Sequence, residues 1–169
     1  MYSFFFDASA LAKRYHQESG SEVVSHLLDD LLPSAPERVA ISPLNLSETV
    51  SVLTRHHNTG RIPTALFQQG MARVLLEGSA VNLPSVDTAV ILNSIPLISR
   101  HNINASDALY LHQALNLQRR LEAEEHELVL VASDQHLLRA AENEGLMTLN
   151  PEEASIADAE ALLRANSET

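Results

Sequence analysis

Short apolar runs alternate with longer stretches of helical spacing along this chain. Between the runs, apolar residues recur at intervals of three and four, as at Leu46, Val50 and Leu53, which is typical of a helix that packs on one face. The runs are rich in β-branched or aromatic residues, as buried strands are. They cover Tyr2 to Phe6, Val39 to Ile41, Leu128 to Ala132 and Leu146 to Leu149, with a weaker run from Ala80 to Leu83. This alternation predicts an α/β fold, a three-layer α/β/α sandwich with a mainly parallel central sheet of about five strands.

Capping residues indicate where several helices begin and end. Ser42, which precedes a proline, and Asn104 are both expected to start a helix, and Gly145 is expected to end one before the last strand. The apolar pattern over residues 85–100 favours a further helix. Pro96 is expected to kink or end that helix, because proline lacks the backbone N–H that the helix needs.

Composition narrows the class of protein. The chain has 169 residues and no cysteine, with 45% hydrophobic and 20% charged residues, which are the proportions of an ordinary globular domain. We expect a single domain over residues 1–169, since no linker or repeat divides the chain. The absence of cysteine excludes thiol catalysis and thiolate metal sites. The 11 basic and 22 acidic residues give a net charge of -11, which excludes a general nucleic-acid coat.

The opening apolar segment does not read as a targeting sequence. Asp7 follows it too soon for a signal peptide. No apolar run approaches the ~20 residues of a membrane span. We therefore expect a cytoplasmic protein without a membrane anchor.

Acidic residues stand where a parallel sheet would hold a ligand. Asp7 and Asp134 each follow a strand candidate, and open parallel sheets bind ligands beyond the carboxyl ends of their strands. Glu48 lies well inside its predicted helix with apolar neighbours on both sides. Each acid also has a structural alternative, because an aspartate after a strand can cap a helix, and Asn104 with Asp107 can form a capping pair.

Several carboxylates in one partly buried crevice would repel each other and take up protons unless a cation holds them ionised. A set of oxygen ligands without cysteine suits Mg²⁺ or Mn²⁺ better than Zn²⁺. His56 and His57 are adjacent in a predicted helix and would point to different faces, so we do not count them as ligands. The acids together favour a site for a hard divalent cation.

The acids sit in four segments of distinctive sequence, which are Phe6 to Tyr15, Ser42 to Glu48, Asn104 to Leu111 and Val131 to Leu138. In this order the segments resemble the motifs of the PIN-domain family, and within it the VapC-type ribonuclease toxins of prokaryotic toxin–antitoxin pairs. The resemblance places the acidic quartet of that family at Asp7, Glu48, Asp107 and Asp134, with no member missing. It implies an active, metal-dependent endoribonuclease.

The resemblance also implies roles for these residues. Asp7 and Asp107 would be the main ligands of Mg²⁺ or Mn²⁺, and Glu48 and Asp134 would bind through water or hold a second ion. The metal would activate water for in-line attack on a phosphodiester of RNA. A homodimer and a small antitoxin that occludes the site are the implied partners.

Neighbouring residues could support this chemistry. Ser9 and Ser133 could form hydrogen bonds to the carboxylates, although both are equally plausible as helix caps. Lys13, Arg14 and Arg55 could form a local positive rim for RNA, with ordinary solvated surface charge as the alternative.

Two other functions remain open at this point. The first is a binding module that keeps the fold without catalysis. The second is a phosphatase or phosphotransferase with Asp7 as nucleophile. The phosphatase pattern wants a second aspartate at position 9, where this chain has Ser9.

Overall fold

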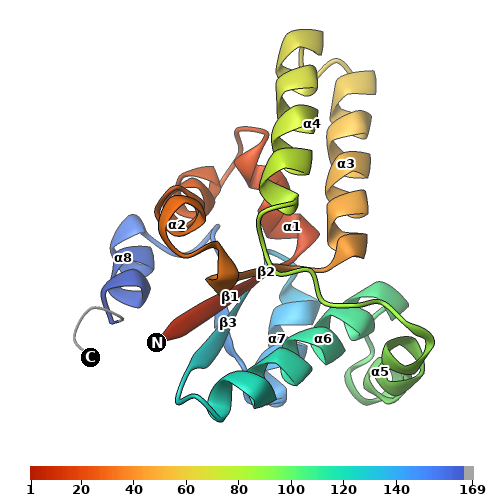
Figure 1. Ribbon diagram of the computed structural model, residues 1–169. Helices are drawn as coiled ribbons and strands as arrows, with labels where there is room; N and C mark the ends of the chain where they lie inside the picture. Colours follow the sequence, from red (N-terminus) through yellow and green to blue (C-terminus); the bar gives the residue numbers. More distant parts are fainter. Residues whose placement is uncertain (166–169) are drawn as a thin grey trace.

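The computed structural model describes residues 1–165, and within them a sheet of four parallel strands forms the centre of the molecule (Figure 1). Phe6 at the end of β1 pairs with Ile41 on one side and Val131 on the other. The carboxyl ends of three neighbouring strands are therefore level at one edge. The order across the sheet is β2 (Val39–Ile41), β1 (Tyr2–Phe6), β3 (Glu127–Val131) and β4 (Met147–Leu149).

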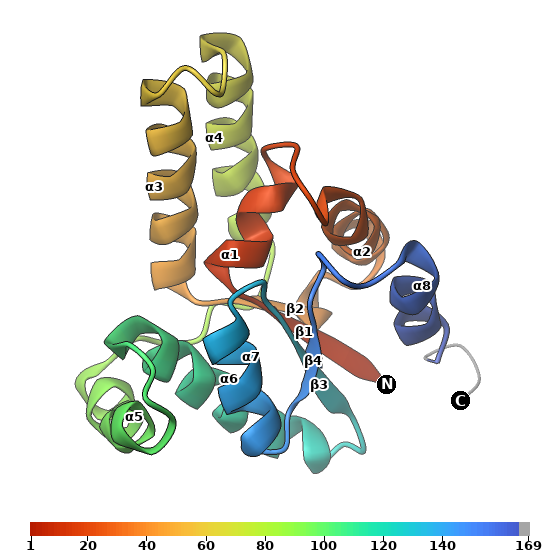
Figure 2. The same ribbon diagram turned by 180° about the vertical axis from the view of Figure 1, so that it is seen from behind.

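Helices cover both faces of this sheet (Figures 1 and 2). Phe5 packs on one face with residues of α6 and α7, whereas Phe4 and Phe6 pack on the other with residues of α1 and α2. All three phenylalanines are fully buried, as expected for a parallel strand covered on both faces. The helical segments are α1 (Ala8–Leu11), the 3₁₀ turns η1 (Ala12–Arg14) and η2 (Pro36–Arg38), α2 (Ser21–Ser34), α3 (Pro43–Asn58), α4 (Thr64–Gly78), α5 (Thr88–His101), α6 (Ala105–Glu122), α7 (Gln135–Asn143) and α8 (Ile156–Arg164).

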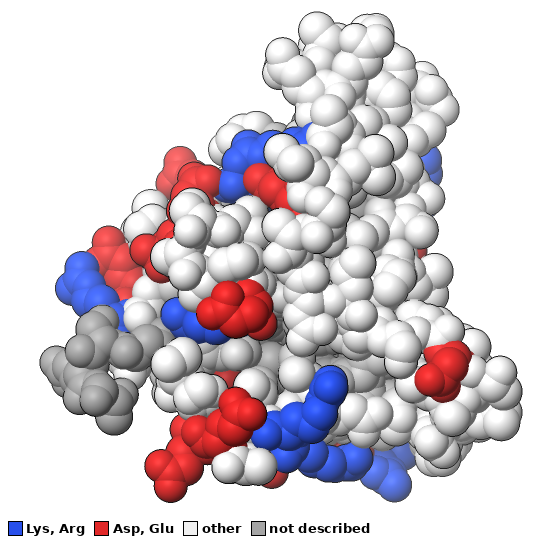
Figure 3. All heavy atoms as spheres, viewed as in Figure 1, with Lys and Arg blue, Asp and Glu red and all other residues white. Residues whose placement is uncertain are grey.

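Helices α3 and α4 form a hairpin, the arm, that projects beyond the carboxyl edge of the sheet (Figures 1 and 2). The arm has a small core of its own around Leu53 and Ile62. His57 reinforces its turn, because its Nδ1 lies 3.0 Å from the Ile62 carbonyl oxygen and its ring stacks on Phe67. The far end of the arm shows no acidic side chain in Figure 3.

The α/β class and the parallel sheet are confirmed, but the strand count is lower than expected. The run from 80 to 83 forms only an isolated bridge, in which Asn82 pairs with Ala40. Asn82 donates to the Val39 carbonyl and accepts from the Ile41 N–H, at 2.9 and 3.0 Å. Pro84 follows two residues later and has no N–H with which to extend the ladder. Within residues 1–165 the sheet therefore has four strands, not about five.

The helix expected over residues 85–100 is present as α5, but Pro96 does not end it. Leu92, whose carbonyl loses its helical partner to Pro96, is exposed, so water can satisfy that oxygen. The helix ends only at His101, and the residue that caps it, Asn102, has a left-handed φ of 52°. The expected starts at Ser42 and Asn104 are confirmed as the N-caps of α3 and α6.

Two further expectations concern the limits of the chain. The predicted domain runs to residue 169, and its last four residues lie outside the described part, so this boundary stays a prediction. No helix in residues 1–165 combines the length and the apolar character that crossing a bilayer requires.

Candidate active site

Asp7 lies at the end of the central strand and is almost fully buried, with 5% of its surface exposed. Its N–H extends the pairing with β3 by donating to the Val131 carbonyl at 2.9 Å. Its side chain caps α1, because Oδ2 accepts from the Ser9 N–H at 2.9 Å and from the Ser9 hydroxyl at 2.6 Å. Burial raises the pKa of Asp7 above its usual value, and the Ser9 hydrogen bonds act against that rise.

A buried amide fixes the start of α3 to the end of β1. The side chain of Asn45 accepts from the Ala8 N–H and donates to the Phe6 carbonyl, both at 3.2 Å. This clamp brings Glu48, one helical turn further on, close enough to raise the pKa of Asp7. Sequence reasoning missed the role of Asn45. The signal was an asparagine three residues before the acid of the second motif.

Asp107 lies in the first turn of α6 and forms the expected capping pair. Its N–H donates to Asn104 Oδ1 at 2.9 Å, and Asn104 Nδ2 donates to Asp107 Oδ2 at 2.8 Å. Burial, followed by the charges of Asp7 and Asp134 and by that of Glu48, raises the pKa of Asp107 to about 6. The structure therefore brings the four acids into electrostatic reach of one another. We call Asp7, Glu48, Asp107 and Asp134 the carboxylate site.

Asp134 caps α7, which is the structural role that the sequence also allowed for it. Its Oδ1 accepts from the N–H groups of His136 and Leu137 at 2.7 and 3.1 Å. The preceding residue links this end of β3 to β1, because the Ser133 N–H donates to the Ser9 hydroxyl at 2.9 Å. The expected bond from the Ser133 hydroxyl to a carboxylate is absent, since this buried oxygen has no partner within residues 1–165.

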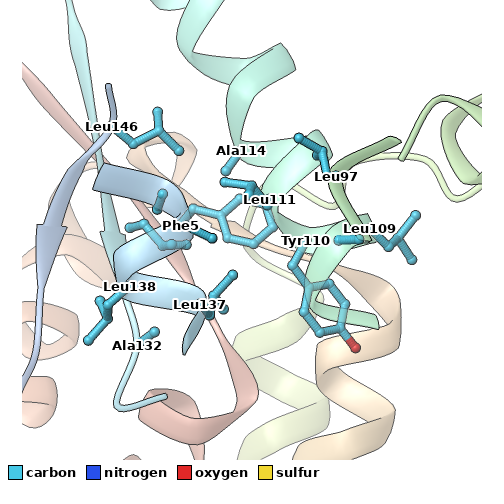
Figure 4. Close-up of a cluster of buried hydrophobic side chains, with 14 of the residues drawn as sticks. Phe5, Leu97, Leu109, Tyr110, Leu111, Ala114, Ala132, Leu137, Leu138 and Leu146 are labelled. Atoms are coloured by element: carbon cyan, nitrogen blue, oxygen red, sulfur yellow. The ribbon is translucent and has the colours of Figure 1, made fainter. Parts of the chain in front are cut away.

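Tyr110 is a second residue that sequence reasoning missed. Figure 4 shows its ring beside the buried cluster around Phe5 and Leu111, with the hydroxyl pointing away from the cluster. Burial and the Glu48 carboxylate raise the pKa of Tyr110, and its buried hydroxyl forms no hydrogen bond by distance and angle within residues 1–165. The available signal was its position one turn after Asp107 on the same predicted helix.

The donor chemistry of this site fits a hard divalent cation. None of the ion pairs within residues 1–165 involves one of the four acids, so their negative charge lacks a nearby counter-ion. The hydrogen bonds described above use one oxygen each of Asp7, Asp107 and Asp134, and the second oxygen can still coordinate an ion. In this arrangement, no three His, Asp or Glu side chains of residues 1–165 form a ready metal-binding group.

The cations expected to form a rim for RNA behave differently from one another. Lys13 is buried, and its Nζ lies 2.7 Å from Glu152 and 3.5 Å from Glu18. Arg14 is also buried and pairs with carboxylates of α2 and α4. Their charges are neutralised inside the protein, so neither a positive rim nor solvated surface charge describes them. Arg55 is exposed on α3.

Comparison with known proteins agrees with this fold. The chain is similar to PAE2754 from Pyrobaculum aerophilum, with a TM-score of 0.61 and 19% identity over 94% of this chain and 96% of that one. It is also similar to FitAcB from Neisseria gonorrhoeae, with a TM-score of 0.55 and 14% identity over 89% of this chain and 99% of that one. The search of curated proteins gives no significant match.

The match to a family is more direct. A family model described as the PIN domain matches residues 4–143, which include all four acids of the carboxylate site. Members of this family are generally nucleases that use divalent metal ions. The chain thus belongs to the PIN domain family.

Proposed function

We propose that this protein is a metal-dependent endoribonuclease that hydrolyses phosphodiester bonds of RNA. One observation carries the proposal. Acids from four separate segments meet at the carboxyl edge of a parallel sheet, where burial and the neighbouring carboxylates raise the pKa of Asp7 and of Asp107, and none of the four has a cationic partner within residues 1–165. Such an arrangement is costly for the fold by itself, and a bound divalent cation would remove the cost.

In this proposal Asp7 and Asp107 hold Mg²⁺ or Mn²⁺ directly, and Glu48 and Asp134 hold it through water or hold a second ion. When bound, the ion supplies an activated water and neutralises charge at the phosphate. Oxygen ligands of this kind suit hard cations.

The protein's own residues orient the acids. Ser9 gives two hydrogen bonds to one oxygen of Asp7 and so favours the ionised form that a cation needs. The Tyr110 hydroxyl, which has no hydrogen-bond partner within residues 1–165, is available to donate to Glu48, the acid that raises its pKa. Asn45 keeps the start of α3, and with it Glu48, beside the end of β1.

We further propose that the protein is the toxin of a toxin–antitoxin pair, acting as a homodimer that a small antitoxin inhibits. The VapC-like motifs are the first support. The second is exposed apolar surface, since Ile91, Leu92 and Ile95 of α5 are 48%, 58% and 51% exposed. Leu76 at the end of α4 is 72% exposed beside a cavity of about 470 Å³ between α2 and α4. Ile91 and Ile95 are one turn apart on α5, and neighbouring exposed apolar residues are typical of protein interaction sites.

The first test compares the unmodified chain with Asp7→Asn on single-stranded and structured RNA in Mg²⁺ or Mn²⁺. We expect the substitution to lower the cleavage rate by about 10²-fold to 10³-fold, as loss of a group that stabilises the transition state does. The matched control is Asp87→Asn. Asp87 also caps a helix through its carboxylate, but it lies at the start of α5 outside the carboxylate site.

Cleavage that survives Asp7→Asn would contradict the proposed site. If the unmodified chain cleaves no RNA with any of several metals, the result would contradict the nuclease proposal and favour a non-catalytic binding module. Thermal unfolding of each variant would establish that the substitutions leave the fold intact.

A further inference from the structure

The part of the arm that lies far from the sheet differs in charge from the rest of this acidic protein. The chain has 22 acidic residues, but none lies in residues 49–76, which we call the distal arm. This segment contains Arg55, Arg61 and Arg73 together with two adjacent histidines. Figure 3 shows the same segregation, since red side chains lie below the far end of the arm. A positive surface on a protein of net charge -11 can attract an anion locally.

Two of these arginines are available to a ligand. Arg55 and Arg61 are both exposed, and neither takes part in any ion pair within residues 1–165. Arg73, by contrast, pairs with Glu77 and Asp29. The free positive charge of the distal arm is therefore concentrated near its turn.

The two arginines meet around a pair of histidines. The rings of His16 and His56 lie edge to face, with centroids 4.8 Å apart. Burial lowers the pKa of His56, and the nearby His16, Arg61 and Arg55 lower it further, whereas Glu18 raises it. Glu18 itself lies 3.5 Å from Lys13. His56 Nδ1 is buried and has no hydrogen-bond partner within residues 1–165.

A cavity of about 340 Å³ opens beside this cluster, between the arm and the segment after η1. Apolar residues such as Ile62 and Leu66 form part of its lining, and the polar or cationic part includes Tyr15, His16, Gln17, Arg61, Gln69 and Arg73. The cavity offers N–H donors and positive charge to a ligand, and no Asp or Glu lines it. A phosphate group matches that chemistry.

Helix α3 also connects this cluster with the carboxylate site. Arg55 follows Glu48 by seven residues on α3. Seven residues are two turns, so the two side chains share one face of the helix about 10 Å apart along its axis. A nucleic acid strand at the carboxylate site could therefore run along this face to the distal arm. An acidic peptide would gain no binding energy from a helix face that leads to the carboxylate site.

We propose that Arg55 and Arg61, with His16 and His56, bind the phosphodiester backbone of the RNA strand on one side of the cleavage point. This inference rests on the proposed ribonuclease function. It gives the RNA strand a path over the protein surface, from the carboxylate site along α3 to the turn of the arm. It also explains how an acidic protein can hold RNA after Lys13 and Arg14 are neutralised by internal ion pairs.

The test measures equilibrium binding of a fluorescent twelve-nucleotide single-stranded RNA by anisotropy. Asp7→Asn is the parent chain, so that the strand stays intact. We expect Arg55→Gln and Arg61→Gln each to weaken binding severalfold and to reduce the salt slope by about 0.7, the change expected when one fewer phosphate of a single strand is neutralised. Arg120→Gln is the matched control. Arg120 is an exposed arginine near the far end of α6, thirteen residues from Asp107.

RNA binding and a salt slope that are unchanged in both arm variants would overturn the inference. Poly-glutamate is the second probe. If the arm variants lose poly-glutamate binding but keep RNA binding, the surface recognises an acidic protein segment and the inference is wrong.

Cleavage assays separate this inference from the nuclease proposal. If the unmodified chain cleaves RNA and the arm variants bind and cleave normally, only the arm inference fails. If no chain cleaves RNA but the arm variants bind it less tightly, the nuclease proposal fails, and of the arm inference only the binding of the RNA backbone stands. Unfolding curves that match the parent would show that Arg55→Gln and Arg61→Gln leave the fold unchanged.

Discussion

Two regions of this molecule that bury charged side chains treat them in opposite ways. In the Arg14 network, Arg14 pairs with Asp29 at 2.7 Å and with Glu77 at 3.1 Å, and Glu77 also accepts from Tyr15 and Arg73. In the carboxylate site, four acids stand together without a cationic partner among the described residues 1–165. The Arg14 guanidinium accordingly lowers the pKa of Asp29, whereas burial and neighbouring acids raise the pKa of Asp107 to about 6.

The difference separates charges that hold the fold from charges that await a ligand. The Arg14 network joins η1, α2 and α4, so its ion pairs are satisfied within the protein. The carboxylate site keeps a repulsion that a stable fold does not need, and groups with pKa values perturbed in this way cluster at functional sites. Stability is often reduced at such sites.

The largest expected effect on stability comes from breaking the Arg14 network. Arg14→Met leaves Glu77, whose side chain is only 13% exposed, without one of its two arginines. We expect the free energy of unfolding to fall by about 3 kcal/mol, since removing one partner leaves a buried charge uncompensated. Urea denaturation measures the loss.

The control for this substitution is Arg100→Met. Arg100 pairs with Glu144 at 2.8 Å, but its side chain is 59% exposed, and exposed pairs contribute at most ~1 kcal/mol. A loss in Arg14→Met no greater than that in Arg100→Met would remove the distinction between the two regions.

The next effect, from metal binding, is expected only in the carboxylate site. Mn²⁺ at about one hundred times its dissociation constant would raise the free energy of unfolding by about 2.7 kcal/mol. The double variant with Asp7→Asn and Asp107→Asn should lose this stabilisation, and Arg14→Met should keep it. Thermal unfolding with Mn²⁺ and with a chelator gives the comparison. An equal stabilisation of the double variant would place the ion elsewhere.

Much of the fold could be predicted because its strands are continuous apolar runs. Three consecutive phenylalanines at positions 4 to 6 are buried on both faces of the sheet, and a buried parallel strand needs such a sequence. The run from 80 to 83 has a similar pattern but forms a single bridge, because a neighbouring proline limits the ladder. Pattern alone does not tell a strand from an extended loop that touches an edge.

The acids of the carboxylate site could be chosen from sequence because Asp7, Asp107 and Asp134 stand at the ends of recognisable elements and Glu48 stands in a recognisable motif. Their supports could not be chosen in this way. Asn45 acts on backbone groups of Phe6 and Ala8, 39 and 37 residues away. Lys13 lies near Asp7 in sequence, yet it pairs with Glu152, 139 residues away. Contacts at such separations are set by the packed fold, which local pattern does not encode.

The smallest expected effect is the change in the free energy of unfolding when one aspartate is replaced by asparagine. This change has opposite signs in the two regions. Asp107 has a pKa of about 6 in the folded chain against 3.8 for the ordinary side chain. The metal-free fold therefore loses stability as pH rises from about 4 to about 6, because the unfolded chain ionises first. Asp107→Asn removes this loss, and Asn104 can still donate to its side-chain oxygen. We expect a gain on the order of 1 kcal/mol at pH 7.5, discounted for the partial exposure of the side chain, and no gain near pH 3.5.

Asp29→Asn provides the opposite case, because the pKa of Asp29 is lowered by Arg14. The ion pair stabilises the fold above the ordinary pKa of an aspartate and is lost as the pH falls through the lowered value. This substitution should therefore destabilise the fold at pH 7.5, and its effect should disappear in acid. Urea denaturation of both variants at pH 3.5 and pH 7.5, with a chelator present, measures the two signs. The comparison fails if Asp107→Asn destabilises the metal-free chain at pH 7.5. The ionised Asp107 would then stabilise the fold without a bound ion.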